Sequence, residues 1–361
     1  MTALALPGNL TTGSGRLSRL AARRDRWIVP VWAAVLAAVA GVSAAATAAL
    51  YPAAADRAGA AAAIAAAPAL RAVYGPIAES AALGSLALWK LGVLDAVGTA
   101  LLTGLTVVRH TRAEEDDGRL DLLAAGGVGR LAPAVAALAA GLGAALLITV
   151  LTAAVLVGVG LPVPGSVAFA VGWGASGAVF AAVALVAAQL ARSARAARAL
   201  LVAALLGAYL VRAAADGGVA PSWLVWASPL GWGERLDAFG ANRWAVLPLA
   251  LAAAAVLTAV ALALQVRRDA GAGLLPERAG PARGGLRGPL GLAWRQQRAA
   301  LLGWAVGVRA ARCPLRERHG EPGRAARQPP DARWSRCSVG RGPSATPSWR
   351  RSSACSQASP R

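Results

Sequence analysis

Long apolar runs separated by shorter polar segments make up most of the chain as far as residue 265. Six of these runs are long enough to cross a hydrocarbon layer, which takes about 20 helical residues at about 1.5 Å each. Lipid offers no water to unpaired backbone groups, and barrel strands would alternate apolar and polar positions, so helices are predicted. The pattern therefore predicts an all-α fold, a polytopic membrane helix bundle with six transmembrane helices. These cover residues 27–50, 86–108, 131–159, 166–190, 199–215 and 244–264.

The arginines are distributed unevenly among the segments that join these runs. They crowd one set of segments: Arg16, Arg19, Arg23, Arg24, Arg26; Arg109, Arg112, Arg119, Arg130; Arg192, Arg195, Arg198; Arg267 and Arg268. The opposite set carries few, namely Arg57, Arg71, Arg235 and Arg243. Short loops rich in basic residues stay in the cytoplasm, so we expect a multi-pass protein of the cell membrane whose N-terminus is cytoplasmic. A basic start before an apolar run also resembles a signal peptide, but the first run is longer than the apolar core of such a peptide.

Composition narrows the function classes. The chain is 57% hydrophobic and 15% charged, with a formal net charge of +20. In a soluble protein that charge would suggest nucleic acid. Here it is carried by the arginines that set topology and by the C-terminal residues, so membrane lipid is the expected partner and nucleic acid is not.

Residues able to perform catalysis are scarce. Lys90 is the single lysine, so the glycine-lysine motif of a phosphate-binding loop is absent. The histidines are His110 and His319, and the three cysteines all lie beyond residue 309. No metal-ligand spacing or cysteine–histidine pair results, so we expect neither a catalytic site nor a metal site, and no enzyme activity. A membrane-embedded enzyme is disfavoured as an alternative because no two catalytic groups converge in the sequence.

Residues 109–130, RHTRAEEDDGRLDLLAAGGVGR, place dense mixed charge between the second and third apolar runs. Thr111 followed by Glu114 matches a capping box, which predicts that a helix begins there. Leu120 and Leu123 share one helical face, the pattern of a helix that docks into a groove, and Gly118 weakens that helix at its own position. The plainer interpretation is a solvated charged loop with two incidental leucines.

The order of residues in this loop resembles the first cytoplasmic loop of the permease subunits of type-2 ABC exporters. Gly118, Leu120, Asp121, Leu123 and Arg130 fall in the register of that loop, while Arg119 and Gly127 depart from it. Further stretches resemble actinobacterial polyketide-antibiotic exporter permeases, and together the resemblance covers residues 15–307. These stretches are 107–115, 188–198, 228–232 and 267–282.

The resemblance implies a coupling helix that lies in a groove of a separate ABC ATPase subunit. The residues it assigns to that contact are Glu114, Glu115, Gly118, Leu120, Asp121, Leu123 and Arg130. ATP and Mg would then bind the partner, with no cofactor in this chain. The implied activity is ATP-driven export of hydrophobic or amphipathic small molecules of antibiotic or polyketide type, which would confer antibiotic resistance. A membrane protein with a structural or regulatory role and no transport is the alternative.

A short internal repeat agrees with this resemblance. Six residues recur at a constant offset of 272: Leu20, Ala21, Arg23, Arg26, Trp32 and Ala33 match Leu292, Ala293, Arg295, Arg298, Trp304 and Ala305. Transporters commonly contain duplicated bundles. We therefore expect an N-terminal segment 1–26, a transmembrane domain 27–265, and a linker 266–308 that begins a second repeat and a seventh span.

Asp95 is an acid inside the second apolar run. A carboxylate at that depth must face the bundle or a wet cavity, which makes it a candidate for a substrate pathway. Its alternative role is a hydrogen bond to a neighbouring helix. Lys90, five residues earlier, points about 140° away on a helix and can extend to the membrane surface instead of pairing with Asp95.

Residues 309–361 have a different character. They contain twelve arginines against three acids, all three cysteines (Cys313, Cys337 and Cys355), and abundant proline, serine and glycine. Such a segment cannot bury a core, so disorder is predicted. We favour a frameshift in a GC-rich gene over a basic tail that binds anionic lipid. On that interpretation the product is a half-permease that is inactive alone; with a genuine tail, the six-span unit would work as a homodimer.

Overall fold

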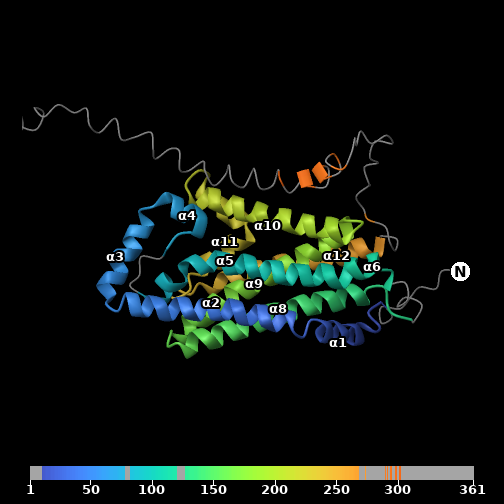
Figure 1. The fold of residues 1–361 in the computed structure, drawn as a ribbon, viewed down its shortest axis with the longest axis horizontal. Helices are drawn as coiled ribbons and strands as arrows, with labels where there is room; N and C mark the ends of the chain where they lie inside the picture. The colour runs from blue at the N-terminus through green and yellow to red at the C-terminus, as the bar shows by residue number, and fades with distance from the viewer. Residues whose placement is uncertain are drawn as a thin grey trace, which may run out of the picture. The chain divides into compact units, whose positions relative to one another are not determined.

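The computed structural model describes residues 10–77, 82–119 and 127–267, together with residue 273 and a few helical positions between 289 and 301. Six helices in this part are long and apolar enough to cross a membrane, and each coincides with one predicted run. They lie side by side in Figure 1, and the described residues contain no strand. The predicted all-α bundle of a multi-pass membrane protein is thereby confirmed. The six are α2 (Ile28–Leu50), α5 (Leu83–Val108), α8 (Ala132–Gly158), α9 (Val163–Leu190), α10 (Ala194–Asp216) and α12 (Leu247–Arg267).

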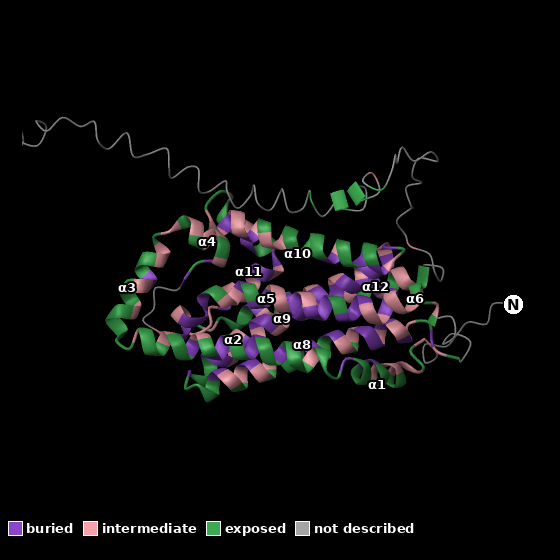
Figure 2. Cartoon of the chain, viewed as in Figure 1, coloured by how far each residue is buried: buried purple, intermediate pink, exposed green. Residues whose placement is uncertain are grey.

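Helix α9 is the centre of the bundle. It packs against α5, α8, α10 and α12, and it is the most buried of the six, whereas α12 is the least buried. Figure 2 shows buried residues concentrated along α5 and α9. A Cβ atom on Gly177 would come within 2.9 Å of the Thr99 side chain, so glycine permits close approach here. Thr103 uses that proximity to donate a hydrogen bond of 2.9 Å to the Gly177 carbonyl.

Shorter helices occupy the two ends of the bundle (Figure 1). At one end, which we call the α1 end, lie α1 (Ser14–Arg24), η2 (Arg109–Ala113) and α6 (Glu114–Asp116). At the opposite end, the α4 end, lie α3 (Ala54–Ala65), α4 (Pro68–Tyr74), η3 (Ser222–Ala227), α11 (Pro229–Arg235) and η4 (Trp244–Val246). The arginine-rich segments that the sequence groups together thus meet at the α1 end.

The predicted helix start at Thr111 is wrong. Helix α5 continues without interruption through η2, a π-helical turn, into α6. Thr111 lies inside this continuous helix and not at its start, and its hydroxyl turns back to donate to the Val107 carbonyl at 2.7 Å. The charged loop is therefore a direct extension of the second transmembrane helix.

Several expectations fall outside the described residues. Leu120, Asp121 and Leu123 lie there, as do residues 309–361 and most of the second repeat copy. The predicted domain boundaries beyond residue 267 stay predictions.

Candidate functional site

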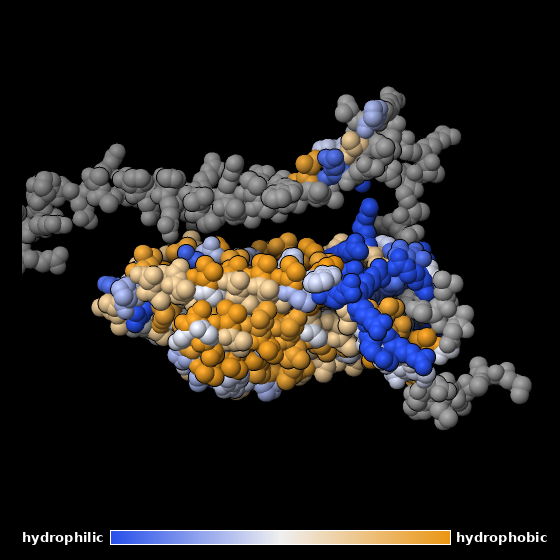
Figure 3. Space-filling model, turned by 60° about the horizontal axis from the view of Figure 1, so that its bottom comes forward, coloured by the Kyte–Doolittle hydropathy of each residue, from blue (hydrophilic) through white to orange (hydrophobic). Residues whose placement is uncertain are grey.

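The α1 end carries a dense cluster of ion pairs, and hydrophilic atoms gather most densely there, whereas the surface between the two ends of the bundle is largely hydrophobic (Figure 3). Asp25, which joins α1 to α2, lies 2.7 Å from Arg109 Nη1 and 2.5 Å from His110 Nε2. Burial raises the pKa of Asp25, but the hydrogen bond to His110 and the positive charges around it outweigh burial. The pKa is therefore held below its ordinary value. These contacts attach α1 to the first residues of the charged loop.

Glu114, the first acid assigned to a partner contact, is engaged within the chain. Its carboxylate pairs with Arg24 of α1 and, at 3.1 Å, with Arg119. Only 16% of its side chain is exposed. Glu114 therefore holds α6 against α1, and its sequence assignment as an ATPase contact stays a prediction.

Arg112 lies fully buried beneath this surface. Its Nε donates to the Ala188 carbonyl at 2.5 Å, and its Nη1 lies 3.1 Å from Glu115. Ala188 is in the last turn of α9, where carbonyls lack partners within the helix and the helix dipole favours a cation. Arg112 thus caps α9, and Glu115, the second assigned acid, compensates its charge.

Two further contacts complete the connections of the loop's first half. Asp116 Oδ2 accepts the N–H of Ala194 at 2.7 Å, which satisfies a free donor at the start of α10. Ser193 Oγ accepts the N–H of Ala196 at 3.3 Å from the same turn. Gly118 then ends the helical segment with φ of +70°, and its N–H donates to the Glu115 carbonyl at 3.0 Å.

The loop is anchored again where it returns to the bundle. The N–H of Gly129 donates to the Thr12 carbonyl at 2.9 Å, and the N–H of Leu131 donates to the Leu10 carbonyl at 2.8 Å. The Arg130 carbonyl accepts a hydrogen bond of 2.9 Å from Gln265 of α12, while Arg130 itself is exposed. The structure thus brings Glu114, Glu115, Gly118 and Arg130 to the same end of the bundle.

Asp95 lies apart from this cluster, about 21 Å along α5 from Arg109 at 1.5 Å per residue. It is buried at 7% exposure, and its Oδ2 has no hydrogen-bond partner within the described part of the chain. Lys90 is exposed, as expected. The alternative role of Asp95, a hydrogen bond to a neighbouring helix, finds no support at this oxygen. A pathway role stays a prediction.

The sequence interpretation missed a second buried arginine, Arg212, near the end of α10. Its guanidinium lies 2.5 Å from Glu234 of α11 and donates to the carbonyls of Ala72 at 3.1 Å and Val73 at 2.7 Å. Asp216 lies 3.7 Å from it, one turn along. This spacing of an arginine and an acid inside an apolar run is the sequence signal that could have found the cluster.

Glu234 is the unusual acid of this second cluster. Burial raises its pKa to about 8, against the attraction of Arg212. Together, Arg212 and Glu234 tie α4, α10 and α11 to one another at the α4 end.

The sequence was compared with known proteins. It is 45% identical over 304 residues to a multidrug efflux system permease protein of Mycobacterium tuberculosis. The chain is similar to an efflux permease. The alignment takes in 83% of this chain and 55% of the mycobacterial permease, so the chain spans about half the length of that relative. No protein-family model matches the sequence. The resemblance to exporter permeases is confirmed, and a permease relative agrees with the expectation that this chain is not itself an enzyme.

Proposed function

We propose that this chain is a membrane-spanning subunit of an efflux transporter, which moves hydrophobic or amphipathic small molecules and is driven by a separate ATPase. The observation that carries the proposal is the 45% identity with a multidrug efflux permease over 83% of a chain that has six apolar helices in its described part. The single lysine, Lys90, is not part of a phosphate-binding loop, which favours ATP hydrolysis by a separate subunit.

The α1 end is the surface proposed to contact the ATPase. Residues 109–119 extend α5 directly, reach α9 through Arg112, and reach α10 through Asp116. A displacement of this segment by a partner would therefore be transmitted to three transmembrane helices through one continuous helix, one buried polar contact and one part-buried polar contact. This is the connection that coupling ATP hydrolysis to helix movement requires.

Residues 120–126 lie between the two anchored parts of the loop and include the leucine pair proposed to enter the groove of the partner. We expect Leu120→Asp with Leu123→Asp to lower the amount of co-expressed ABC ATPase that co-purifies with the chain by at least about tenfold, because two charges would have to enter an apolar groove. Drug efflux from cells would fall in parallel, with membrane insertion unchanged.

Val219→Asp is the matched control, since Val219 is 88% exposed and lies at the α4 end. It should leave ATPase recovery unchanged. Because ATP is hydrolysed in the cytoplasm, docking at the α1 end also tests the expected cytoplasmic N-terminus. Normal ATPase recovery with the double variant would refute the docking assignment.

A further inference from the structure

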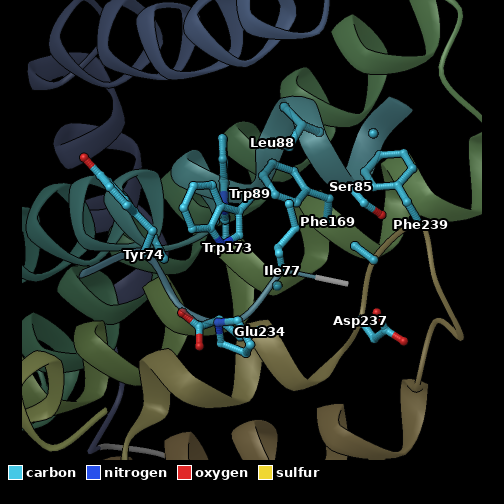
Figure 4. Close-up of a pocket in the computed structure, with 17 residues that line it drawn as sticks. Tyr74, Ile77, Ser85, Leu88, Trp89, Phe169, Trp173, Glu234, Asp237 and Phe239 are labelled. Carbon is cyan, nitrogen blue, oxygen red and sulfur yellow. The ribbon is translucent and has the colours of Figure 1, made fainter. Parts of the chain in front are cut away.

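A cavity of about 100 Å³ lies at the α4 end, between α5, α9, α11 and residues 74–77. Aromatic side chains form much of its wall (Figure 4). Phe169 and Trp173 of α9 lie with ring centres 4.7 Å apart, and Phe239 lies 6.3 Å from Phe169. Trp89 of α5 and Tyr74 form a second pair at 5.2 Å. A flat apolar group entering this space would meet rings from three separate elements.

Phe239 is held at this wall by an unusual backbone. Its φ of +66° is in the left-handed region, which is strained for a bulky aromatic residue. Its ring occupies space that a Cβ atom on Gly84 or Gly165 would need, since such an atom would fall within 2.4 Å or 2.3 Å of the ring. The two glycines therefore make room for the ring, and strain of this kind is found most often at ligand sites.

The indole nitrogen of Trp173 has no protein partner among the described residues, whereas Glu234, an acid on this wall, has partners within the chain. Trp173 is 2% exposed, and its Nε1 donates to no acceptor there. On Glu234, Oε1 contacts Arg212, and the carboxyl group lies within hydrogen-bond reach of the Asp216 carboxyl, which it can bond when one of the two is protonated. Trp89, on the same wall, shows the ordinary arrangement, because its Nε1 donates to the Gly75 carbonyl at 2.8 Å. Buried polar groups are nearly always paired, so the Trp173 N–H marks a position for a ligand, and the face of an aromatic ring can accept it.

The charged side chains that line the cavity are acidic. Glu234 and Asp237 line the cavity, and no lysine, arginine or histidine is among the described residues that do so. Figure 4 shows these two acids on the side opposite Trp173 and Phe169. Arg212, the partner of Glu234, is not among the lining residues, so an anion entering the cavity would meet carboxylates first.

We propose that this cavity binds an aromatic ring that carries a protonated amine, with the ring among the aromatic side chains and the ammonium group directed at Glu234 and Asp237. Both ring faces and carboxylates attract a cation. A ligand cation beside Glu234 also favours the charged form of that carboxyl, which burial opposes. The space is smaller than the engineered cavity of roughly 150 Å³ that accepts benzene, but it is partly open to the surface, so part of a larger ring system can lie outside it.

A role of the cavity in cargo recognition rests on the proposed efflux function, whereas binding of a ligand to the cavity can be tested without it. Binding can be measured with the full chain in lipid nanodiscs and no ATPase present. Radiolabelled tryptamine, an indole ring with a primary ammonium group, is the probe. We expect saturable binding, with competition by indole-3-propionate, which has the same ring and a carboxylate, at least about tenfold weaker.

Gly92→Leu is the principal variant, because Gly92 lines the cavity and touches neither acid. Filling this space should weaken tryptamine binding at least about tenfold. Gly143→Leu is the matched control on an exposed helical position of α8, with no atom within 4 Å of its new Cβ, and should bind as the unaltered chain does. Glu234→Gln should lower tryptamine affinity about tenfold while leaving that of neutral 3-ethylindole unchanged.

Because Glu234 pairs with Arg212, Glu234→Gln can lower stability, whereas Gly92→Leu leaves that ion pair intact and keeps the test decisive. Equal binding of tryptamine and indole-3-propionate, no saturable tryptamine binding, or unaltered tryptamine binding by Gly92→Leu would each overturn the inference. If ATPase-dependent efflux persists while tryptamine binding is absent, only this inference fails. If tryptamine binds but neither efflux nor ATPase recovery depends on Leu120 and Leu123, the proposed coupling fails instead.

Discussion

Arg112 at the α1 end and Arg212 at the α4 end are both fully buried, and both donate to backbone carbonyls of another helix. Their carboxylate partners differ. Glu115 is three residues from Arg112 on the same helical segment, whereas Glu234 belongs to α11 and meets Arg212 through the fold. The α1 cluster continues outward into half-exposed pairs, while the α4 cluster adjoins a cavity. A buried arginine can thus hold a helix end against a docking surface, or it can pair with an acid that lines a cavity.

The largest expected effect follows from removing Arg212. Arg212→Met leaves Glu234 without its partner and frees the carbonyls of Ala72 and Val73, so the stability should fall by about 3–5 kcal/mol. Thermal unfolding of the purified protein in detergent measures the loss. Arg235→Met is the control: Arg235 is partly exposed and 3.7 Å from Asp216, so removing it should cost less than about 1 kcal/mol. Equal losses would mean that the buried cluster does not stabilise the α4 end.

A smaller loss is expected at the other end. Arg112→Gln removes the charged hydrogen bond to Ala188, but it frees one carbonyl, whereas Arg212→Met frees two. The expected cost is about 1.5–3 kcal/mol, by the same unfolding measurement. A larger loss for Arg112→Gln than for Arg212→Gln would reverse the comparison between the two ends.

The smallest effects concern pH, and the two ends should respond with opposite sign. The pKa of Glu234 is raised from 4.5 to about 8, so the folded state binds the proton more tightly. Stability should therefore fall as pH rises from about 5 towards 8 and level off above that. The pKa of Asp25 is lowered from 3.8, so its contribution is present above that pH and disappears as pH falls below it.

Unfolding midpoints measured from below pH 3.8 to above about pH 8 test the direction in which stability changes at each end of the bundle. Glu234→Gln should reduce the fall in stability between about pH 5 and 8, and Asp25→Asn should reduce the fall in stability below pH 3.8. A rise in stability between pH 5 and 8 that depends on Glu234 would contradict the assigned direction.

The helix bundle could be predicted from the sequence because every residue of an apolar run contributes to the signal for burial in lipid. The first span, predicted at residues 27–50, is a helix over Ile28–Leu50. The sequence was insufficient where a polar group depends on a distant partner. Arg212 meets carbonyls 139 and 140 residues away, a pairing that no local spacing encodes.

The capping prediction failed for a related reason. Thr111 and Glu114 have the right spacing for a helix start, but spacing does not say whether the preceding residues are already helical. The bonds of Glu114 to Arg24, and of Asp116 to Ala194, also depend on how α1 and α10 pack, so the sequence could place these acids at the correct end without revealing their partners.

The π turn at Arg109–Ala113 has a consequence for how this loop can change in evolution. A π turn holds one residue more than an α turn, and each residue turns a helix by about 100°. Losing one residue here would swing Glu114 away from Arg24, and Asp116 away from Ala194, while leaving every transmembrane side chain of α5 in place. Insertions and deletions in this turn therefore change the direction in which the loop faces its surroundings, and they also move Arg112 relative to the end of α9.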